Sequence, residues 1–210
     1  LEQAMPVLRA RRLDAVLARA RTLLLTARCH LGQHARAEEL CDALITERTV
    51  AGDPEGRRDL QLTRCLLLMD QERWEAAARL VEELDGPDAV VSSTFAADVV
   101  VLRALLALRR DRAGTRVDEL RSTLEGSPDP RNARRLATIR AVAAARAGDD
   151  PLPWLEATSS DDPEATSLER IVQAVRTRDP APLLPIVELR EPAPMVTRVL
   201  ARHLVALRPS

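Results

Sequence analysis

The residues best suited to metal chemistry lie together near the start of the chain. Cys29, His30, His34 and Cys41 fall within one short stretch. Two histidines four residues apart can both ligate zinc when they share one face of a helix. Here Gly32 lies between the two histidines at an expected turn, and the sequence contains neither an HExxH motif nor a CxxC pair. We therefore expect no metal site and no cofactor.

Catalytic patterns are also missing. Glu38 and Glu39 are adjacent, as are Glu82 and Glu83, but neighbouring positions on a helix point about 100° apart, so neither pair forms an acid and base around one substrate. The sequence has no P-loop, no GxGxxG and no nucleophile elbow. His203 lies far from any serine or cysteine in a recognisable nucleophile setting. These observations predict a protein that is not an enzyme.

Charge excludes further classes of partner. The 210 residues include 31 basic and 32 acidic ones, a formal net charge of -1, so no broad attraction to nucleic acid or to an anionic membrane follows. Arginine clusters at 9–12 and 131–140 are interpreted as solvated helix faces, because only 1% of the residues are aromatic and base stacking has little to use. We expect no direct contact with nucleic acid.

Localisation follows from the cysteines and from the apolar runs. Cys29, Cys41 and Cys65 are an odd number without close pairing, which indicates small core residues in a reducing compartment. No apolar run is long enough to span a membrane, and the N-terminus does not resemble a secretion signal. The chain is thus expected in the cytoplasm and, because it starts at Leu1 rather than Met, is interpreted as a piece of a longer protein. Its oligomeric state cannot be predicted.

The elements that carry these residues repeat along the chain. A shift of about forty residues aligns Leu25 with Cys65 and Leu105 in one apolar register. Apolar residues three and four apart predict two amphipathic helices in each copy, joined by the short polar connections "LGQH", "DQER" and "RDRAG". The Gly- and Pro-containing stretches "TVAGDPEG", "DGPDAVVSS" and "GSPDPRN" separate the copies, and their Asp and Ser residues are suited to cap the next helix.

After residue 126 the repeat weakens. Helices are expected in "ARRLATIRAVAAARAG", "DPEATSLERIVQAVRTRD" and "APMVTRVLARHLVALR", with a short one in "DDPLPWLEA". The last long helix is predicted to be amphipathic, with Met195, Val199, Leu200 and Leu204 on one side. We divide the chain into helical repeats at 1–126 and, continuous with them, degenerate repeats with capping helices at 127–210.

The pattern resembles the tetratricopeptide (TPR) family, in the divergent form attached to large bacterial regulators of the MalT or LuxR type. The matching positions are Leu31, Gly32, His34, Ala37, Cys41 and Leu44, repeated as Glu72, Trp74, Ala77, Val81 and Leu84. The repeat is near forty residues rather than thirty-four, and the third copy has Gly114 and Val117 at the aromatic and small positions. The resemblance implies an all-α, right-handed α-solenoid of antiparallel helix pairs with a period of about 40 residues.

In such a solenoid the first helix of each pair lines a concave surface. The resemblance therefore implies a scaffold that binds a partner protein or peptide there, with an apolar floor and arginines for an acidic group. Two alternatives remain open for this surface: its leucines are core residues, or the C-terminal segment covers it. A different function is an effector-sensing domain that binds a small molecule in the groove. The expected partner-binding residues are Arg19, Thr26, His30, Leu66, Met69, Asp70, Leu106, Arg109 and Arg110.

Overall fold

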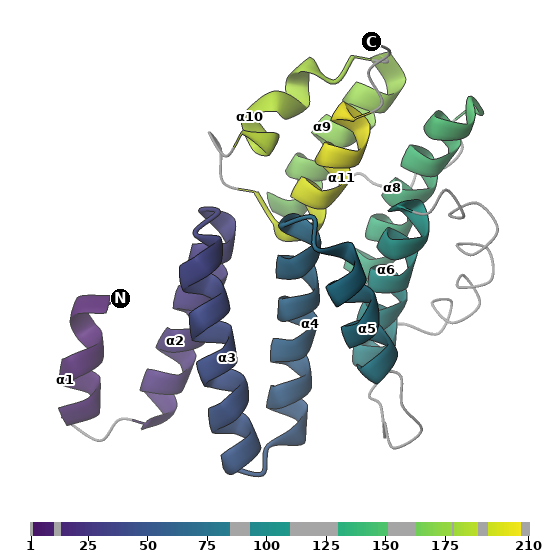
Figure 1. Cartoon of the computed structure of the whole chain (residues 1–210). Coiled ribbons are helices and arrows are strands. Elements are labelled where there is room, and N and C mark those ends of the chain that lie inside the picture. The colour runs from purple at the N-terminus through teal and green to yellow at the C-terminus, as the bar shows by residue number, and fades with distance from the viewer. Residues whose placement is uncertain are drawn as a thin grey trace.

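The regular structure of the chain is helical. The structure, a computed structural model, describes residues 2–10, 14–84, 93–109, 130–150, 163–177, 179–188 and 193–206, and none of these lies in a strand (Figure 1). The all-α prediction is therefore confirmed for this part of the chain. No helix in these ranges is long and apolar enough to cross a membrane. The α-helices are α1 (Met5–Ala10), α2 (Asp14–His30), α3 (His34–Val50), α4 (Pro54–Asp70), α5 (Trp74–Leu84), α6 (Ser93–Arg109), α8 (Pro130–Ala147), α9 (Pro163–Thr177), α10 (Leu184–Val187) and α11 (Met195–Val205), and the 3-10 helices are η1 (Glu2–Ala4) and η3 (Ala181–Leu183).

Two helical hairpins, α2 with α3 and α4 with α5, form the N-terminal half. Residues 31–33 and 71–73 join their helices, as the polar connections predicted, while the third connection, "RDRAG", lies outside the described residues. Gly32 has a φ of 65° and Glu72, at the matching place, a φ of 61°. In both turns the next residue donates its amide back to the helix it leaves, from Gln33 to Arg28 O and from Arg73 to Leu68 O, both at 2.9 Å.

The hairpins are separated by a short capped turn. Gly52, with a φ of 66°, ends α3, and Asp53 begins α4 by accepting a hydrogen bond from the Gly56 amide at 2.9 Å. Arg48 also donates to the Asp53 carboxylate, at 2.8 Å. The predicted capping role of an Asp between copies is confirmed here, with Pro54 in the first turn, where its missing amide is not needed.

The residues aligned by the forty-residue shift are buried alike. Leu25 on α2, Cys65 on α4 and Leu105 on α6 are buried in the hydrophobic core, each at most 2% exposed. Ala37 and Ala77 are fully buried near the starts of α3 and α5, where only a small side chain lets the helices approach closely. Positions 117, 120 and 124 of the third copy lie outside the described residues.

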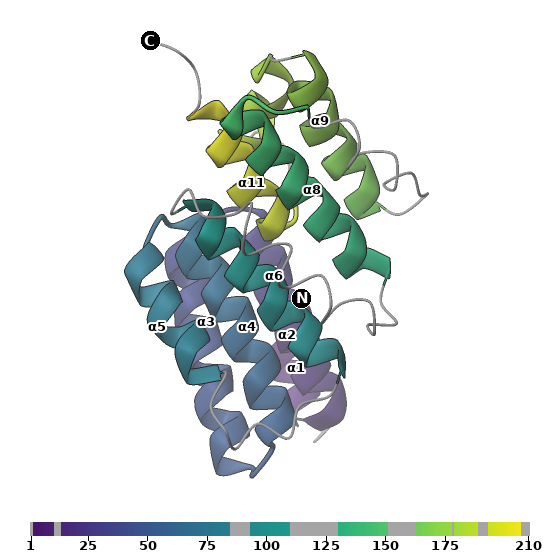
Figure 2. The same ribbon diagram turned by 90° about the vertical axis from the view of Figure 1, so that its right-hand side faces the viewer.

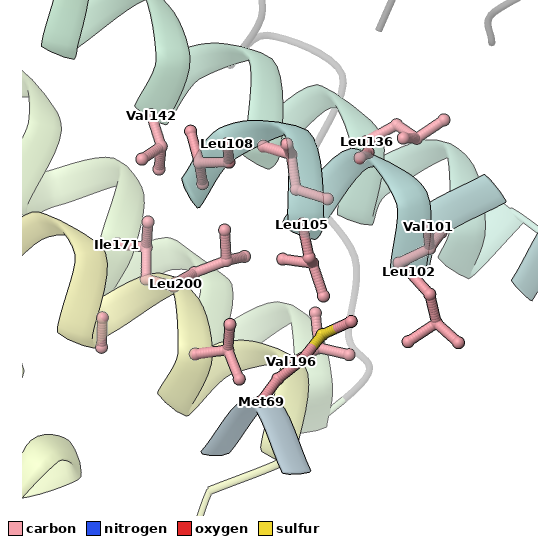
Figure 3. Close-up of a cluster of buried hydrophobic side chains, with 14 of the residues drawn as sticks. Met69, Val101, Leu102, Leu105, Leu108, Leu136, Val142, Ile171, Val196 and Leu200 are labelled. Carbon is pink, nitrogen blue, oxygen red and sulfur yellow. The ribbon is translucent and has the colours of Figure 1, made fainter. Parts of the chain in front are cut away.

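Helix α4 has two apolar faces, and each joins a different cluster. Leu60 and Leu67 pack with α2 and α3, whereas Leu62 and Met69 pack with the later helices. A hairpin that covers one of these faces leaves the other open, so a second layer must cover it. Figure 3 shows this second layer, where Met69 lies beside side chains of α6 and α11.

The C-terminal helices continue the same core. Val142 of α8, Ile171 of α9 and Leu200 of α11 belong to one cluster with Leu105 of α6, so the predicted regions 1–126 and 127–210 share a hydrophobic interior. Helix α11 returns to the N-terminal half and packs on α4, far away in the sequence (Figures 1 and 2).

Burial around α11 differs from the prediction. Val199, Leu200 and Leu204 are buried as expected, but so are Val196 and Ala201. The predicted apolar side is therefore buried, with Met195 packed against the N-terminal cluster, but burial extends to other faces of the helix as well. It is enclosed on most sides because α4, α6, α8, α9 and α10 all contact it.

Candidate functional site

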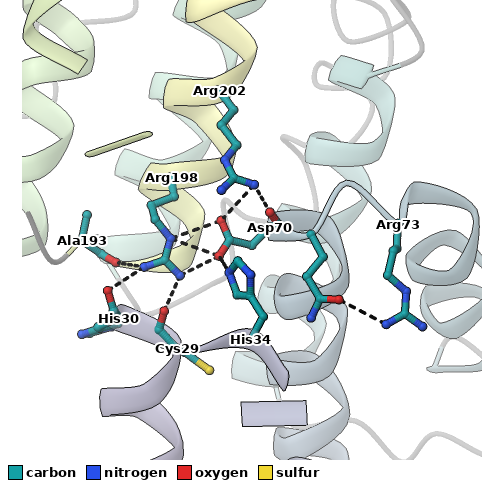
Figure 4. A network of polar contacts seen from close by, with 9 residues as sticks. Cys29, His30, His34, Asp70, Arg73, Ala193, Arg198 and Arg202 are labelled. Atoms are coloured by element: carbon teal, nitrogen blue, oxygen red, sulfur yellow. Dashed lines mark hydrogen bonds and ion pairs between the residues drawn. The ribbon is translucent and has the colours of Figure 1, made fainter. Parts of the chain in front are cut away.

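A fully buried arginine joins α11 to the two N-terminal hairpins. Arg198 Nε lies 3.2 and 3.1 Å from the two carboxylate oxygens of Asp70, and Nη2 lies 2.7 Å from Oδ2 (Figure 4). The remaining donors reach backbone carbonyls: Nη1 donates to His30 O at 3.0 Å and Ala193 O at 2.9 Å, and Nη2 donates to Cys29 O. Each N–H-bearing nitrogen therefore has acceptors, which a buried guanidinium requires.

These carbonyls belong to the last turns of helices. Cys29 and His30 end α2, where carbonyl groups lack helical partners and carry the negative end of the helix dipole. One turn after Arg198, Arg202 donates from Nη1 to the Asp70 carbonyl at the end of α4. Two arginines four residues apart on α11 thus cap the C-terminal ends of α2 and α4.

The Asp70 carboxylate is the centre of this polar cluster. It is fully buried, and besides Arg198 it contacts His34 Nε2, which lies 2.9 Å from Oδ2, and Arg202 Nη1, 3.8 Å from Oδ1. A fully buried carboxylate with this many partners is not open to a substrate. Its role in the described structure is to fix the junction of α2, α3, α4 and α11.

An aromatic contact completes the junction. The Trp74 ring at the start of α5 lies 5.2 Å from the His203 ring, centroid to centroid, with the planes inclined by 43°. The resemblance placed Trp74 at the bend between helices, and it lies there, but it also contacts α11. His203 is buried in this contact, so it is not a solvent-accessible base.

The cysteines form no disulfide. Cys29, Cys41 and Cys65 are buried free thiols, as predicted for core residues. Burial raises the pKa of Cys29 to about 11 and the pKa values of Cys41 and Cys65 to about 12. At neutral pH these thiols are protonated, which makes them poor nucleophiles. In the described ranges no group of three or more His, Cys, Asp and Glu side chains is placed to hold a metal ion.

The predicted partner-binding residues do not lie on one surface. His30, Met69 and Asp70 come together under α11, where Met69 and Asp70 are buried and His30 supplies a carbonyl to Arg198. The C-terminal segment therefore covers this end of the expected surface, which was one of the open alternatives. Leu66 and Leu106 are half-buried against the core, Arg19, Thr26 and Arg109 are exposed, and Arg110 lies outside the described residues.

Two of the exposed predicted residues belong to a stripe along one face of α2. Val16, Arg19, Leu23 and Thr26 are three or four residues apart, so they share a face of the helix. Val16 is 50% and Leu23 is 52% exposed, although both are aliphatic. We call these four residues the α2 stripe.

A pocket opens beside the polar cluster. It has a volume of about 880 Å³ and lies between the start of α3, the α4–α5 turn, α10 and the end of α11. We call it the α3–α11 pocket. Its lining combines charged and aliphatic side chains: His34, Ala35, Glu38, Asp70, Gln71, Glu72, Val187, Arg202, Val205 and Ala206.

Arg198 and Arg202 were not among the residues predicted from the sequence. The signal available was their spacing of four residues inside the apolar run "MVTRVLARHLV", where a charged residue must find a partner if the helix is buried. Nothing in that run identifies Asp70 or the ends of α2 and α4 as the partners.

Comparison with family models, with curated proteins and with solved structures finds no match to this chain. The described residues form an all-helical protein whose candidate functional features are the junction, the α2 stripe and the α3–α11 pocket.

Proposed function

We propose that the chain is a noncatalytic, TPR-like scaffold that binds a partner protein through the exposed α2 stripe. The helices form a right-handed solenoid with a period of about 40 residues. The matched bounds of the first two hairpins support this period: α2 and α4 end at His30 and Asp70, and α3 and α5 begin at His34 and Trp74. The chain acts in the cytoplasm as a region of a larger bacterial regulator.

The α2 stripe is the observation that carries the proposal. Exposed aliphatic side chains on one helix face can serve as anchors for a partner helix. Val16 and Leu23 are in this state, with Arg19 between them. The chemistry suits an amphipathic helix that presents aliphatic side chains to the two apolar residues and a carboxylate to the arginine.

The test is selection from a displayed library of helical peptides with the full chain as bait. We expect binders that combine aliphatic residues with an acidic one. Leu23→Glu and Arg19→Glu each weaken these binders at least about tenfold, because they remove apolar contact and the cation respectively.

Val50→Glu is the matched control. Val50 is 85% exposed at the end of α3, so this variant adds the same charge outside the stripe. A library that yields no binders, or binders that all three variants weaken equally, contradicts the proposed interface.

A second candidate function is effector sensing, and the α3–α11 pocket favours it. The pocket is lined by His34 and Arg202, which also hold the junction between the hairpins and α11. A small molecule bound there contacts the residues that set how these helices are joined. If α11 and the hairpins can be joined in two arrangements, such a ligand shifts the population toward the arrangement that it binds more tightly.

A further inference from the structure

Arg202 presents unused hydrogen-bond donors to the α3–α11 pocket. Its Nη1 donates to the Asp70 carbonyl and lies 3.8 Å from Asp70 Oδ1, and these are its contacts within the described residues. The Nε–H and Nη2–H groups form the other edge of the guanidinium. The side chain is 23% exposed and lines the pocket, which is open to solvent, so a ligand there can reach this edge. Two parallel N–H groups on one edge match the two oxygens of a carboxylate.

The balance of charges around the pocket favours a ligand with one negative charge. Asp70 is neutralised by buried Arg198, and Glu38 is paired with Arg73 at 2.7 Å. Among the described residues Arg202 shares its one carboxylate partner, Asp70, with Arg198, so two arginines face a single negative charge. The exposed carboxylate of Glu72, on the α4–α5 turn, disfavours a second negative charge in the same space.

The remaining walls are aliphatic. Val187 of α10 and Val205 of α11 are half-buried and pack against the hydrophobic core, and Ala35 and Ala206 complete the lining. The described lining contains no Phe, Tyr or Trp, and its one aromatic ring, the imidazole of His34, contacts the Asp70 carboxylate. The lining offers apolar surface to a short alkyl chain.

We propose that the α3–α11 pocket binds a small aliphatic monocarboxylate, with the carboxylate held by Arg202 and the alkyl chain held against Val187 and Val205. This inference rests on effector sensing, the second candidate function, and gives that function a class of ligand. It is independent of the α2 stripe, which lies on another helix.

Calorimetric titration of the full chain with three matched probes tests the ligand class. Hexanoate, hexan-1-ol and hexylamine share an alkyl chain and differ in their head groups. We expect hexanoate to bind with one site per chain and the other two to bind at least about tenfold more weakly, since neither forms the charge-assisted pair. Equal binding of the three probes, or no hexanoate binding up to about 10 mM, overturns the proposal.

Variants locate the site. Arg202→Gln should weaken hexanoate at least about tenfold, because the amide keeps neither the charge nor the paired donors. Arg79→Gln, on the exposed face of α5, is the matched control and should leave the affinity unchanged. Hexanoate affinity that survives Arg202→Gln overturns the role of Arg202.

A second variant guards against a folding effect of Arg202→Gln, since Arg202 also holds the end of α4. Ala35→Phe adds a ring at an exposed position of the pocket wall and leaves every contact of Arg202 in place. It should abolish hexanoate binding while circular dichroism stays unchanged. Hexanoate binding that persists in Ala35→Phe places the ligand elsewhere and overturns the proposal.

Glu72→Gln completes the design. Removing this carboxylate should strengthen hexanoate binding and allow adipate, which carries a second carboxylate, to bind.

If Ala35→Phe blocks hexylamine but hexanoate never binds, the carboxylate proposal fails and effector sensing survives. If none of the probes is sensitive to Ala35→Phe, the carboxylate proposal and the sensing role of this pocket fail together.

Discussion

Arg198 and Asp70, 128 positions apart in the chain, form an ion pair in which neither side chain is exposed to solvent. The pair joins α11 to the end of α4, and the same guanidinium reaches two carbonyls at the end of α2. In a simple solenoid each repeat contacts its neighbours alone. Here one side chain fixes the ends of two successive hairpins, so α11 sets their relative position.

Asp70→Ala should destabilise the chain strongly. It leaves the Arg198 charge buried without its counter-ion, which costs about 3–5 kcal/mol. Replacing both partners, Asp70→Leu with Arg198→Met, should recover part of this loss, because the apolar pair has no charge to desolvate but leaves the Cys29 and His30 carbonyls without their donor. Urea unfolding followed by circular dichroism measures both effects.

Asp42→Ala is the control for that experiment. It also removes a carboxylate from an ion pair, but Asp42 and Arg64, 3.0 Å apart, are 47% and 36% exposed. An exposed pair contributes about 0–1 kcal/mol. Similar losses in Asp42→Ala and Asp70→Ala would show that burial of the Arg198 pair has no special energetic importance.

Met69→Glu and Arg109→Glu should behave differently, although both positions were expected in one groove. Met69 is 1% exposed beside Leu102 and Val196, so a carboxylate there is buried without a partner and should prevent cooperative folding (Figure 3). Arg109 is exposed at the end of α6, where an acidic residue meets the negative end of the helix and costs about 0.3–1 kcal/mol. Thermal melts distinguish the two. A cooperative melt for Met69→Glu near that of the parent chain would place Met69 outside the core.

Local features of this fold were predictable because they depend on residues close in sequence. The positive φ of Gly32, the cap at Asp53 and the shared burial of Leu25 and Cys65 each follow from spacing or backbone chemistry within one hairpin. Burial of α11 was not predictable in this way. The sequence shows that α11 is largely apolar. The number of helices that surround it depends on tertiary contacts, which the sequence of the helix does not contain.

The candidate sites divide along the same line. Exposure of Arg19 and Thr26 agrees with their expected place on a surface, whereas Asp70 was assigned to a surface and is in fact covered by α11. Periodicity places a residue on a face of its own helix. Periodicity does not show whether a distant helix covers that face. A charged residue such as Arg198 in an apolar run indicates that a partner is needed, but it does not identify the partner.

Glu72→Gly should stabilise the chain. Glu72 occupies the left-handed region that Gly32 occupies in the matching turn, and a side chain there costs about 1–2 kcal/mol. Glycine removes this strain but makes the unfolded chain more flexible, so we expect a net gain of up to about 1 kcal/mol. Denaturant midpoints measure it.

Two alanine variants test the cause of that gain. Glu72→Ala removes the carboxylate and keeps the Cβ atom, so it should bring no comparable stabilisation. Gly32→Ala introduces the Cβ atom where the parent chain has none and should cost about 1 kcal/mol or more. If Glu72→Ala stabilises as much as Glu72→Gly, charge rather than backbone strain is the cause.

Alkaline pH should destabilise the chain through its three buried thiols. The sequence has no Lys and no Tyr, so few side chains other than the cysteines titrate between pH 9 and 12. Burial raises the pKa of Cys29 to about 11 and the pKa values of Cys41 and Cys65 to about 12, while the thiols of the unfolded chain ionise near 9.0.

The sign follows from proton counts. Between pH 9 and 11 the folded chain keeps thiol protons that the unfolded chain has lost, so raising the pH favours unfolding. Each thiol contributes a slope of up to about 1.4 kcal/mol per pH unit, and below pH 8 these slopes vanish because both states are protonated. Urea unfolding at a series of pH values measures the slope. The Cys29→Ala, Cys41→Ala, Cys65→Ala triple variant should have a nearly flat profile above pH 9 whatever its absolute stability, and an equally steep profile in that variant would exclude the thiols as the cause.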